Sequence, residues 1–230
     1  MTTTQPVSDH DLIAIGFRLS SVDESRIEVE NVDIESTLLY VIGTFSDDYR
    51  IASILLSWIK VHGNYVIVEK LSKLRAKAAK ITGEASPWMT LVAAWAVECG
   101  YHKWRKLTKK EKAPVYLYDL AVSESAILRK GIIPWAEPYG FRIPQNSLRI
   151  READVLTPQE LIRFNPQYKN RYLFGSSWRA DIVTAIQRGI TSPTELSRTV
   201  GCSYEPAYRI SHEYLMIANL HNNNGFEVEI

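Results

Sequence analysis

The chain has 230 residues, of which 46% are hydrophobic and 23% are charged, enough apolar material for one large domain or two small ones. No run approaches the ~20 apolar residues of a membrane-spanning helix, and the first ten residues do not resemble a secretory signal, so a membrane partner is not expected. Cys99 and Cys202 fit no metal-binding or disulfide spacing, which favours a reducing, cytoplasmic setting.

The net charge of +1 conceals an uneven distribution of charge along the chain. Residues 1–45 carry −6, residues 46–112 carry +7, residues 113–172 carry +2 and residues 173–230 carry −2. Such asymmetry is typical of proteins that bind nucleic acid or an acidic protein partner.

The first 130 residues are predicted to form a helical domain. Residues 12–19 and 26–32 alternate loosely between apolar and polar, which allows a small β-hairpin. Ser46 is the predicted cap of a helix over 47–61, followed by a helix over 68–81. A third helix over 86–99, with Ser86 as its cap, is apolar nearly all round, so we expect it to be the buried centre of this domain.

Lysines recur every three or four residues on the predicted helix 68–81, and six of the eleven residues at 102–112 are basic. Together they predict a basic central face that grips a phosphate backbone, with Trp104 in its midst. The alternative is a solvated helix face and loop, and the acidic head at 1–45 could fold back onto it. The residues predicted to contact phosphate are Lys70, Lys73, Lys77, Lys103, Arg105, Lys106, Lys109 and Lys110.

The next segment has less periodicity. Residues 114–120 are typical of a strand and residues 124–130 of a short helix. Residues 131–171 are predicted to be an irregular linker with one short helix, which a capping box from Thr157 to Glu160 would start and Asn165-Pro166 would close.

Three closely spaced helices are predicted at the C-terminus, over 178–189, 193–200 and 204–218. The run Ser-Pro-Thr-Glu-Leu-Ser-Arg-Thr-Val-Gly-Cys-Ser-Tyr-Glu-Pro-Ala-Tyr-Arg-Ile at 192–210 resembles a helix-turn-helix of the winged-helix kind. Gly201 supplies the turn, Ser197 lets two helices cross, and the apolar residues at 196, 200, 202, 207 and 210 supply the shared core. The wing would be a turn at 222–225 and a last strand at 226–230.

A wider stretch of the chain includes the residues Tyr-Leu-Phe-Gly-Ser-Ser-Trp-Arg-Ala-Asp-Ile from 172 and Ala-Asp-Val-Leu-Thr-Pro-Gln-Glu-Leu from 153. Through these residues it is similar to uncharacterised bacterial winged-helix proteins. These proteins include antitoxin-like regulators of the abortive-infection type. The resemblance implies a winged helix-turn-helix (172–230) in a transcriptional regulator that binds double-stranded DNA. The chain as a whole is expected to be mostly α, and a homodimer is expected because one small recognition helix seldom gives adequate specificity. Residues expected near bases or phosphates are Arg198, Ser203, Tyr204, Glu205, Tyr208, Arg209 and His212.

The alternative function is a protein-interaction module, either a scaffold or a partner that neutralises a toxin. It is favoured by the net charge of −2 over 173–230, because phosphate neutralisation normally drives DNA affinity.

Catalytic motifs are weak. The Gly-Ser-Ser after Phe174 superficially resembles the entry of nucleotidyltransferases, but Asp181 is followed by Ile182 and Val183 and not by a second metal-binding acid. We find no phosphate-binding loop, nucleophile elbow or paired Cys-x-x-Cys, and the histidines are scattered. We therefore expect no enzymatic activity, no cofactor and no metal site.

Overall fold

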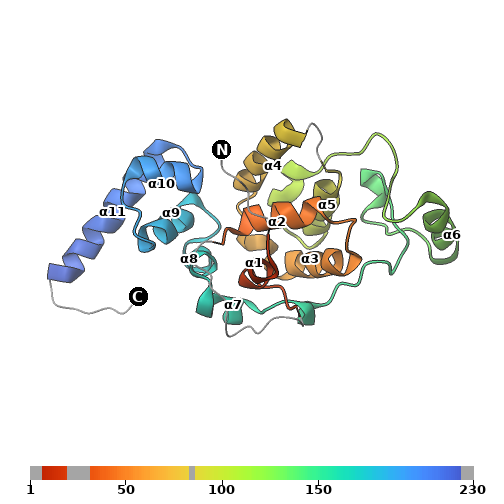
Figure 1. Ribbon diagram of the computed structural model, residues 1–230, viewed down its shortest axis with the longest axis horizontal. Helices are drawn as coiled ribbons and strands as arrows, with labels where there is room; N and C mark the ends of the chain where they lie inside the picture. The colour runs from red at the N-terminus through yellow and green to blue at the C-terminus, as the bar shows by residue number, and fades with distance from the viewer. Residues whose placement is uncertain (1–6, 20–31, 83–85, 224–230) are drawn as a thin grey trace. The chain divides into compact units, whose positions relative to one another are not determined.

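The computed structural model describes residues 7–19, 32–82 and 86–223, and helices dominate them (Figure 1). The chain divides into two compact units, an N-terminal unit (Met1–Phe164) and a C-terminal unit (Asn165–Ile230). In the described ranges no helix is both long enough and apolar enough to cross a bilayer.

The N-terminal unit is built around two buried helices, α3 and α5, against which α2 packs. Trp58 of α3 and Leu91 of α5 are completely buried, which confirms that the helix predicted at 86–99 lies in the core. The helices of this unit are α1 (Asp9–Ala14), α2 (Ile34–Gly43), α3 (Tyr49–His62), α4 (Val68–Thr82), α5 (Trp88–Glu98), α6 (Leu120–Lys130) and α7 (Pro158–Phe164).

Several helix ends differ from the prediction because other residues cap them. Asp48, and not Ser46, caps α3 by accepting hydrogen bonds from the amides of Arg50 and Ile51. Ser86 makes no capping bond to α5, and its hydroxyl has no hydrogen-bond partner among the described residues. Helix α2 was not predicted; Asp33 caps it through the amide of Ser36.

The predicted hairpin is wrong at its first strand. Residues 12–14 are helical, since Ser8 and Asp11 form a capping box that starts α1. Phe17 then forms an antiparallel bridge with Val155. Most of the second predicted strand lies outside the described residues.

The regular sheet in the described residues is small. β1 (Val115–Tyr116) pairs in parallel with β2 (Phe141–Arg142), with Val115 opposite Phe141, so the strand predicted over 114–120 is shorter than expected. Helix α6 lies between them in the chain, and its Glu124 accepts two hydrogen bonds from Arg142 at 2.9 and 3.1 Å. A parallel pair needs such a crossover connection.

The predicted linker at 131–171 folds as part of both units instead. Residues 131–164 include the 3-10 turns η4 (Glu137–Tyr139) and η5 (Glu152–Asp154), β2 and α7, and belong to the N-terminal unit. They pack because α3 offers two hydroxyls to their backbone: the amide of Arg149 donates to Ser53 and that of Arg151 to Ser57. The capping box of Thr157 and Glu160 is confirmed.

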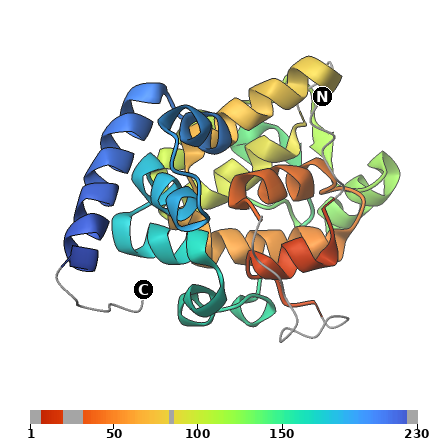
Figure 2. The same ribbon diagram turned by 60° about the vertical axis from the view of Figure 1, so that its left-hand side comes forward.

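The C-terminal unit consists of α8 (Pro166–Phe174), α9 (Trp178–Gln187), α10 (Pro193–Val200) and α11 (Tyr204–Asn223), drawn from teal to blue in Figures 1 and 2. The three helices predicted after residue 177 are confirmed. Asn165 does not only close α7; it also caps the unpredicted α8 by accepting from the amide of Tyr168. α11 continues through Asn223, so the start of the predicted wing is helical, and residues 224–230 lie outside the described residues.

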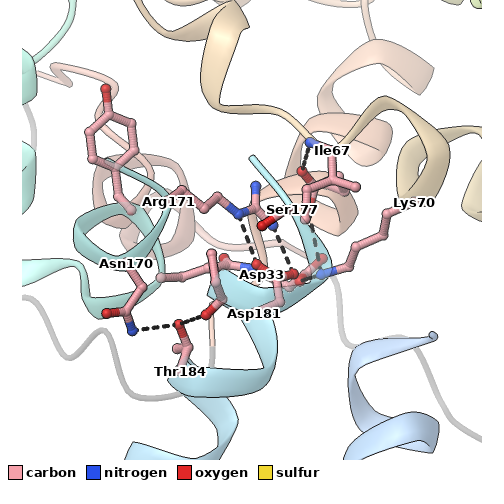
Figure 3. A network of polar contacts seen from close by, with 12 residues as sticks. Asp33, Ile67, Lys70, Asn170, Arg171, Ser177, Asp181 and Thr184 are labelled. Carbon is pink, nitrogen blue, oxygen red and sulfur yellow. Dashed lines mark hydrogen bonds and ion pairs between the residues drawn. The ribbon is translucent and has the colours of Figure 1, made fainter. Parts of the chain in front are cut away.

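A buried ion pair joins α8 to α9. Arg171 donates to both carboxylate oxygens of Asp181, at 2.8 and 2.9 Å, and both side chains are almost completely buried. Beside it, Asn170 donates to Thr184 at 2.9 Å (Figure 3). Fully satisfied polar contacts of this kind fix one packing of the two helices.

Candidate nucleic-acid interface

The turn between α10 and α11 has the geometry that the sequence predicted. Gly201 adopts a left-handed conformation (φ 81°, ψ 21°), and its amide donates to the carbonyl of Ser197 at 3.0 Å. A left-handed residue at this position ends α10 and lets the chain start α11 in a new direction.

The predicted core residues of these helices pack together. Leu196, Val200, Ala207 and Ile210 are buried, and Cys202 is half-buried against them. They form one cluster with apolar residues of α9. The turn and its core therefore hold α9, α10 and α11 as one packed set, with the first turns of α11 at its surface.

The residues predicted to face DNA are all exposed: Ser203, Tyr204, Glu205, Tyr208, Arg209 and His212 on or next to α11, and Arg198 on α10. Three of them form a row along α11. The rings of Tyr204 and Tyr208 stack with centroids 6.0 Å apart, and those of Tyr208 and His212 stack at 6.2 Å. Such i, i+4 contacts place the three rings on one face of the helix.

Two ion pairs use four of the charged side chains of the C-terminal unit and leave its net charge unchanged. Arg171 is used by Asp181, and Arg179 pairs with Glu213 at 2.8 Å. The other charged side chains over residues 165–223 are four cations and two carboxylates. All six are exposed: Lys169, Arg188, Arg198, Arg209, Glu195 and Glu205. The excess of two cations over residues 165–223 comes from Lys169 and Arg171, which precede residue 173, and from leaving out Glu227 and Glu229, so it does not alter the net charge of −2 over 173–230.

Two of the lysines predicted to contact phosphate serve the fold of the N-terminal unit. Lys70 is buried and forms ion pairs with Asp33 and Glu35, so its predicted role in DNA contact is wrong (Figure 3). Glu35 also accepts from the amide of Ile67 at 2.8 Å. The acidic head therefore does fold back onto one member of the basic stripe.

Lys103 is likewise engaged by the backbone. Its ammonium donates to the carbonyls of Asn64 and Val66, at 2.5 and 2.8 Å, in the turn between α3 and α4. Trp104 is completely buried and donates to the carbonyl of Gly63, so it cannot serve as a stacking platform. Both side chains therefore stabilise the turn between α3 and α4.

The remaining predicted cations are exposed. Lys73 and Lys77 lie on α4, and the others lie in or just after the 3-10 turn η3 (His102–Leu107): Arg105, Lys106, Lys109 and Lys110. Lys106 pairs with Glu69 at 2.8 Å, and this hydrogen bond is the main cause that lowers the pKa of Glu69. The basic central face thus exists, with fewer members than predicted.

The structure also reveals a groove between α4 and η3 that the sequence did not point to. It has a volume of about 440 Å³ and is lined by Ser72, Arg75, Ala76, Ala79, Lys106, Leu107, Thr108 and Lys109. The lysine pattern does not point to Arg75, because this residue lies at a different angle around the helix from Lys73 and Lys77. Its place opposite η3 depends on a contact between segments thirty-two residues apart.

Burial shifts the pKa values of two potentially reactive side chains, His62 and Cys99, away from neutral pH. Burial lowers the pKa of His62 to about 4, and one ring nitrogen lies 2.8 Å from the carbonyl of Leu156. Burial raises the pKa of the Cys99 thiol to about 11, so the thiolate nucleophile is scarce at neutral pH.

No protein-family model, curated protein or solved structure matches this chain.

Proposed function

We propose that this protein binds double-stranded DNA through its C-terminal helices and acts as a transcriptional regulator of the winged helix-turn-helix kind, related in role to antitoxin-like regulators. The observation that carries the proposal is the left-handed turn at Gly201, which joins two helices through a shared core and leaves the first turns of α11 exposed. In helix-turn-helix proteins it is the N-terminal part of the second helix that meets the base edges.

The side chains of α11 divide into two roles in this proposal. Arg209 is the candidate for base recognition, because an arginine can donate two hydrogen bonds to guanine in the major groove. Tyr208 and His212, stacked beside it on α11, offer hydrogen-bonding groups to bases or phosphates. One recognition helix covers one half-site, so we also propose that the protein binds as a homodimer.

The exposed basic face of α4 and η3 supports a second role, in sequence-independent affinity. Lys73, Lys77 and Lys110 are exposed lysines that can neutralise phosphates without reading bases. Affinity would come largely from such contacts, and specificity from α11.

A titration of the full chain against fluorescent double-stranded fragments tests the proposal. Between ~50 and ~200 mM salt, the logarithm of the affinity should fall linearly with the logarithm of the salt concentration. Arg209→Ala should cost about 1–3 kcal/mol on a preferred sequence and little on random DNA. Arg179→Ala is the matched control, since Arg179 is an exposed arginine that pairs with Glu213 on the same unit.

The basic face is tested by the triple variant Lys73/Lys77/Lys110→Gln. It should weaken binding to all sequences alike and reduce the salt slope by up to about 3, near 0.9 for each lost phosphate contact. An absence of binding at ~50 mM salt would reject the DNA proposal. Equal losses on preferred and random DNA for Arg209→Ala would reject α11 as the reading helix.

A second candidate function is a protein contact through α11. It is favoured by four exposed large side chains on this helix, which are 52–55% exposed: Tyr204, Tyr208, Met216 and Ile217. Aromatic residues and methionine are enriched at protein interfaces. This function becomes the better proposal when DNA fails to bind at low salt and a defined partner's affinity falls on Tyr208→Ala.

A further inference from the structure

The groove between α4 and η3 combines positive charge with an apolar floor. Three of its eight lining residues are cations, Arg75, Lys106 and Lys109, and no carboxylate lines it. Leu107 is buried beneath it, and Ala76 and Ala79 add two methyl groups from α4. Its volume of about 440 Å³ falls within the ~300–1,000 Å³ of small-molecule sites, which are typically apolar with a few placed polar groups.

Arg75 is the member of this groove whose surroundings point most clearly to a ligand. A guanidinium carries five N–H donors, and in the described part of the chain Arg75 makes one hydrogen bond, at 3.3 Å to the carbonyl of Leu107. Partial burial lowers its pKa, while the charge of Glu111 acts in the opposite direction. A half-buried cation with several unused donors is stabilised by an anion that enters the groove.

Other donors surround the same space. Lys109 is exposed and has no ion pair or hydrogen bond among the described residues. Lys106 reaches the groove while it pairs with Glu69 at the surface, where such pairs exchange readily with other anions. The hydroxyls of Ser72 and Thr108 also line the groove.

We propose that this groove binds a small organic phosphate, with its phosphate groups against Arg75, Lys106 and Lys109 and its apolar part over Ala76, Ala79 and Leu107. A phosphate carries close to two negative charges and three acceptor oxygens, and the planar fork of arginine matches it. A nucleic-acid backbone fits less well, because it would follow the open stripe of Lys73 and Lys77, which do not line the groove. The proposal is independent of DNA binding by α11.

Calorimetric titration of the full chain with four probes tests the groove: pyrophosphate, ADP, ATP and adenosine. We expect the three phosphates to bind with Kd of about 0.1 mM or below and adenosine to show no binding at ~1 mM, because the phosphates supply the charge. Tighter binding of ADP than of pyrophosphate would assign the apolar floor to a nucleoside. Equal affinities would assign the site to the phosphate groups alone, which keeps the proposed charge contacts and removes the apolar part of the proposal.

Matched variants locate the binding. Arg75→Met should weaken ADP binding by about tenfold or more, because it removes the charge and the fork but keeps the length of the side chain. Lys77→Met, on the same helix but outside the groove, should change it less than about twofold. Ala79→Phe should block ADP more than pyrophosphate, since it fills the floor and leaves the charges in place.

Three outcomes would overturn the proposal. The first is that none of the phosphates binds at ~1 mM. The second is that ADP binding survives Arg75→Met, provided that circular dichroism shows a folded variant. The third is that only single- or double-stranded oligonucleotides bind and that Lys77→Met weakens them as much as Arg75→Met, which would make α4 an open backbone-binding surface.

Discussion

The C-terminal helices and the α4–η3 surface differ in what their charged residues do. In the C-terminal unit, two ion pairs each join one arginine to one acid, so they leave the net charge unchanged. In the α4–η3 region, two of the lysines stabilise the fold: Lys70 forms an ion pair with Asp33, and Lys103 donates to the carbonyl of Val66. The α4–η3 region therefore has fewer cations available to phosphate than its segment total of +7 indicates.

The regions also differ in how they present a binding surface. α10 and α11 are fixed by a packed core and a left-handed turn, which positions a small set of side chains on α11. The α4–η3 surface carries exposed lysines around one half-buried arginine. The first arrangement suits discrimination between ligands of similar charge, and the second suits attraction of phosphate in general.

The largest effect should follow from breaking the buried ion pair of the C-terminal unit. Asp181→Ala removes the carboxylate that accepts two hydrogen bonds from the buried guanidinium of Arg171, and the loss of one partner of a buried ion pair typically costs about 3–5 kcal/mol. Hydrogen exchange of the α9 amides in increasing urea measures the loss. DNA binding should fall with it, whereas ADP binding to the groove of the N-terminal unit should persist.

Glu213→Ala is the matched control for this prediction. It breaks the exposed pair with Arg179, whose side chains are 45% and 41% exposed, so the loss should stay below about 1 kcal/mol. Equal losses for the two variants would mean that the buried pair does not hold α8 on α9.

The second-largest effect is a loss of stability of the N-terminal unit at low pH. His62 has a folded pKa of about 4 because burial disfavours its charged form, while the unfolded value is near 6.5. As the pH falls from ~6.5 toward ~4, the unfolded state takes up the proton and the folded state does not, so stability decreases. Between pH ~7 and ~4.5 this group alone should cost about 2.5 kcal/mol.

His62→Gln should remove that part of the pH dependence, since an amide can still donate to the carbonyl of Leu156 and does not titrate. Urea unfolding followed by tryptophan fluorescence is suited to this measurement, because five of the six tryptophans lie in the N-terminal unit. A wild-type curve as flat as that of His62→Gln would contradict the burial of the ring.

Sequence reasoning succeeded where one local pattern decides the structure. The turn at Gly201, the apolar positions around it and the capping box at Thr157 each depend on residues within one or two turns of helix, and all three were predicted. The exposed residues of α11 followed from the same periodicity. Their function remains a proposal.

The sequence predictions were wrong where the bonding partners of a residue come from a distant segment of the chain. Lys70 resembles the other lysines of its stripe, and its ion pairs with Asp33 and Glu35, on a distant segment, set it apart from them. Residues 131–164 lack periodicity because α3 hydroxyls and a two-residue strand hold them, not a repeating apolar face. The groove at Arg75 likewise needs α4 and η3 together.

The smallest predicted effect tests the turn of the C-terminal unit directly. Gly201→Ala places a Cβ where no atom lies within 4 Å, so its cost should be purely conformational, about 1–2 kcal/mol for a left-handed residue. Gly43→Ala is the control: it also meets open space, but it lies in α2 without a positive φ, and it should stabilise by up to about 1 kcal/mol. Gly201→Asn should fall between them, because asparagine tolerates this geometry. Thermal unfolding ranks the stabilities of these three variants. A neutral Gly201→Ala would argue that α10 and α11 do not meet through a left-handed turn. That result would remove the observation on which DNA recognition by α11 depends.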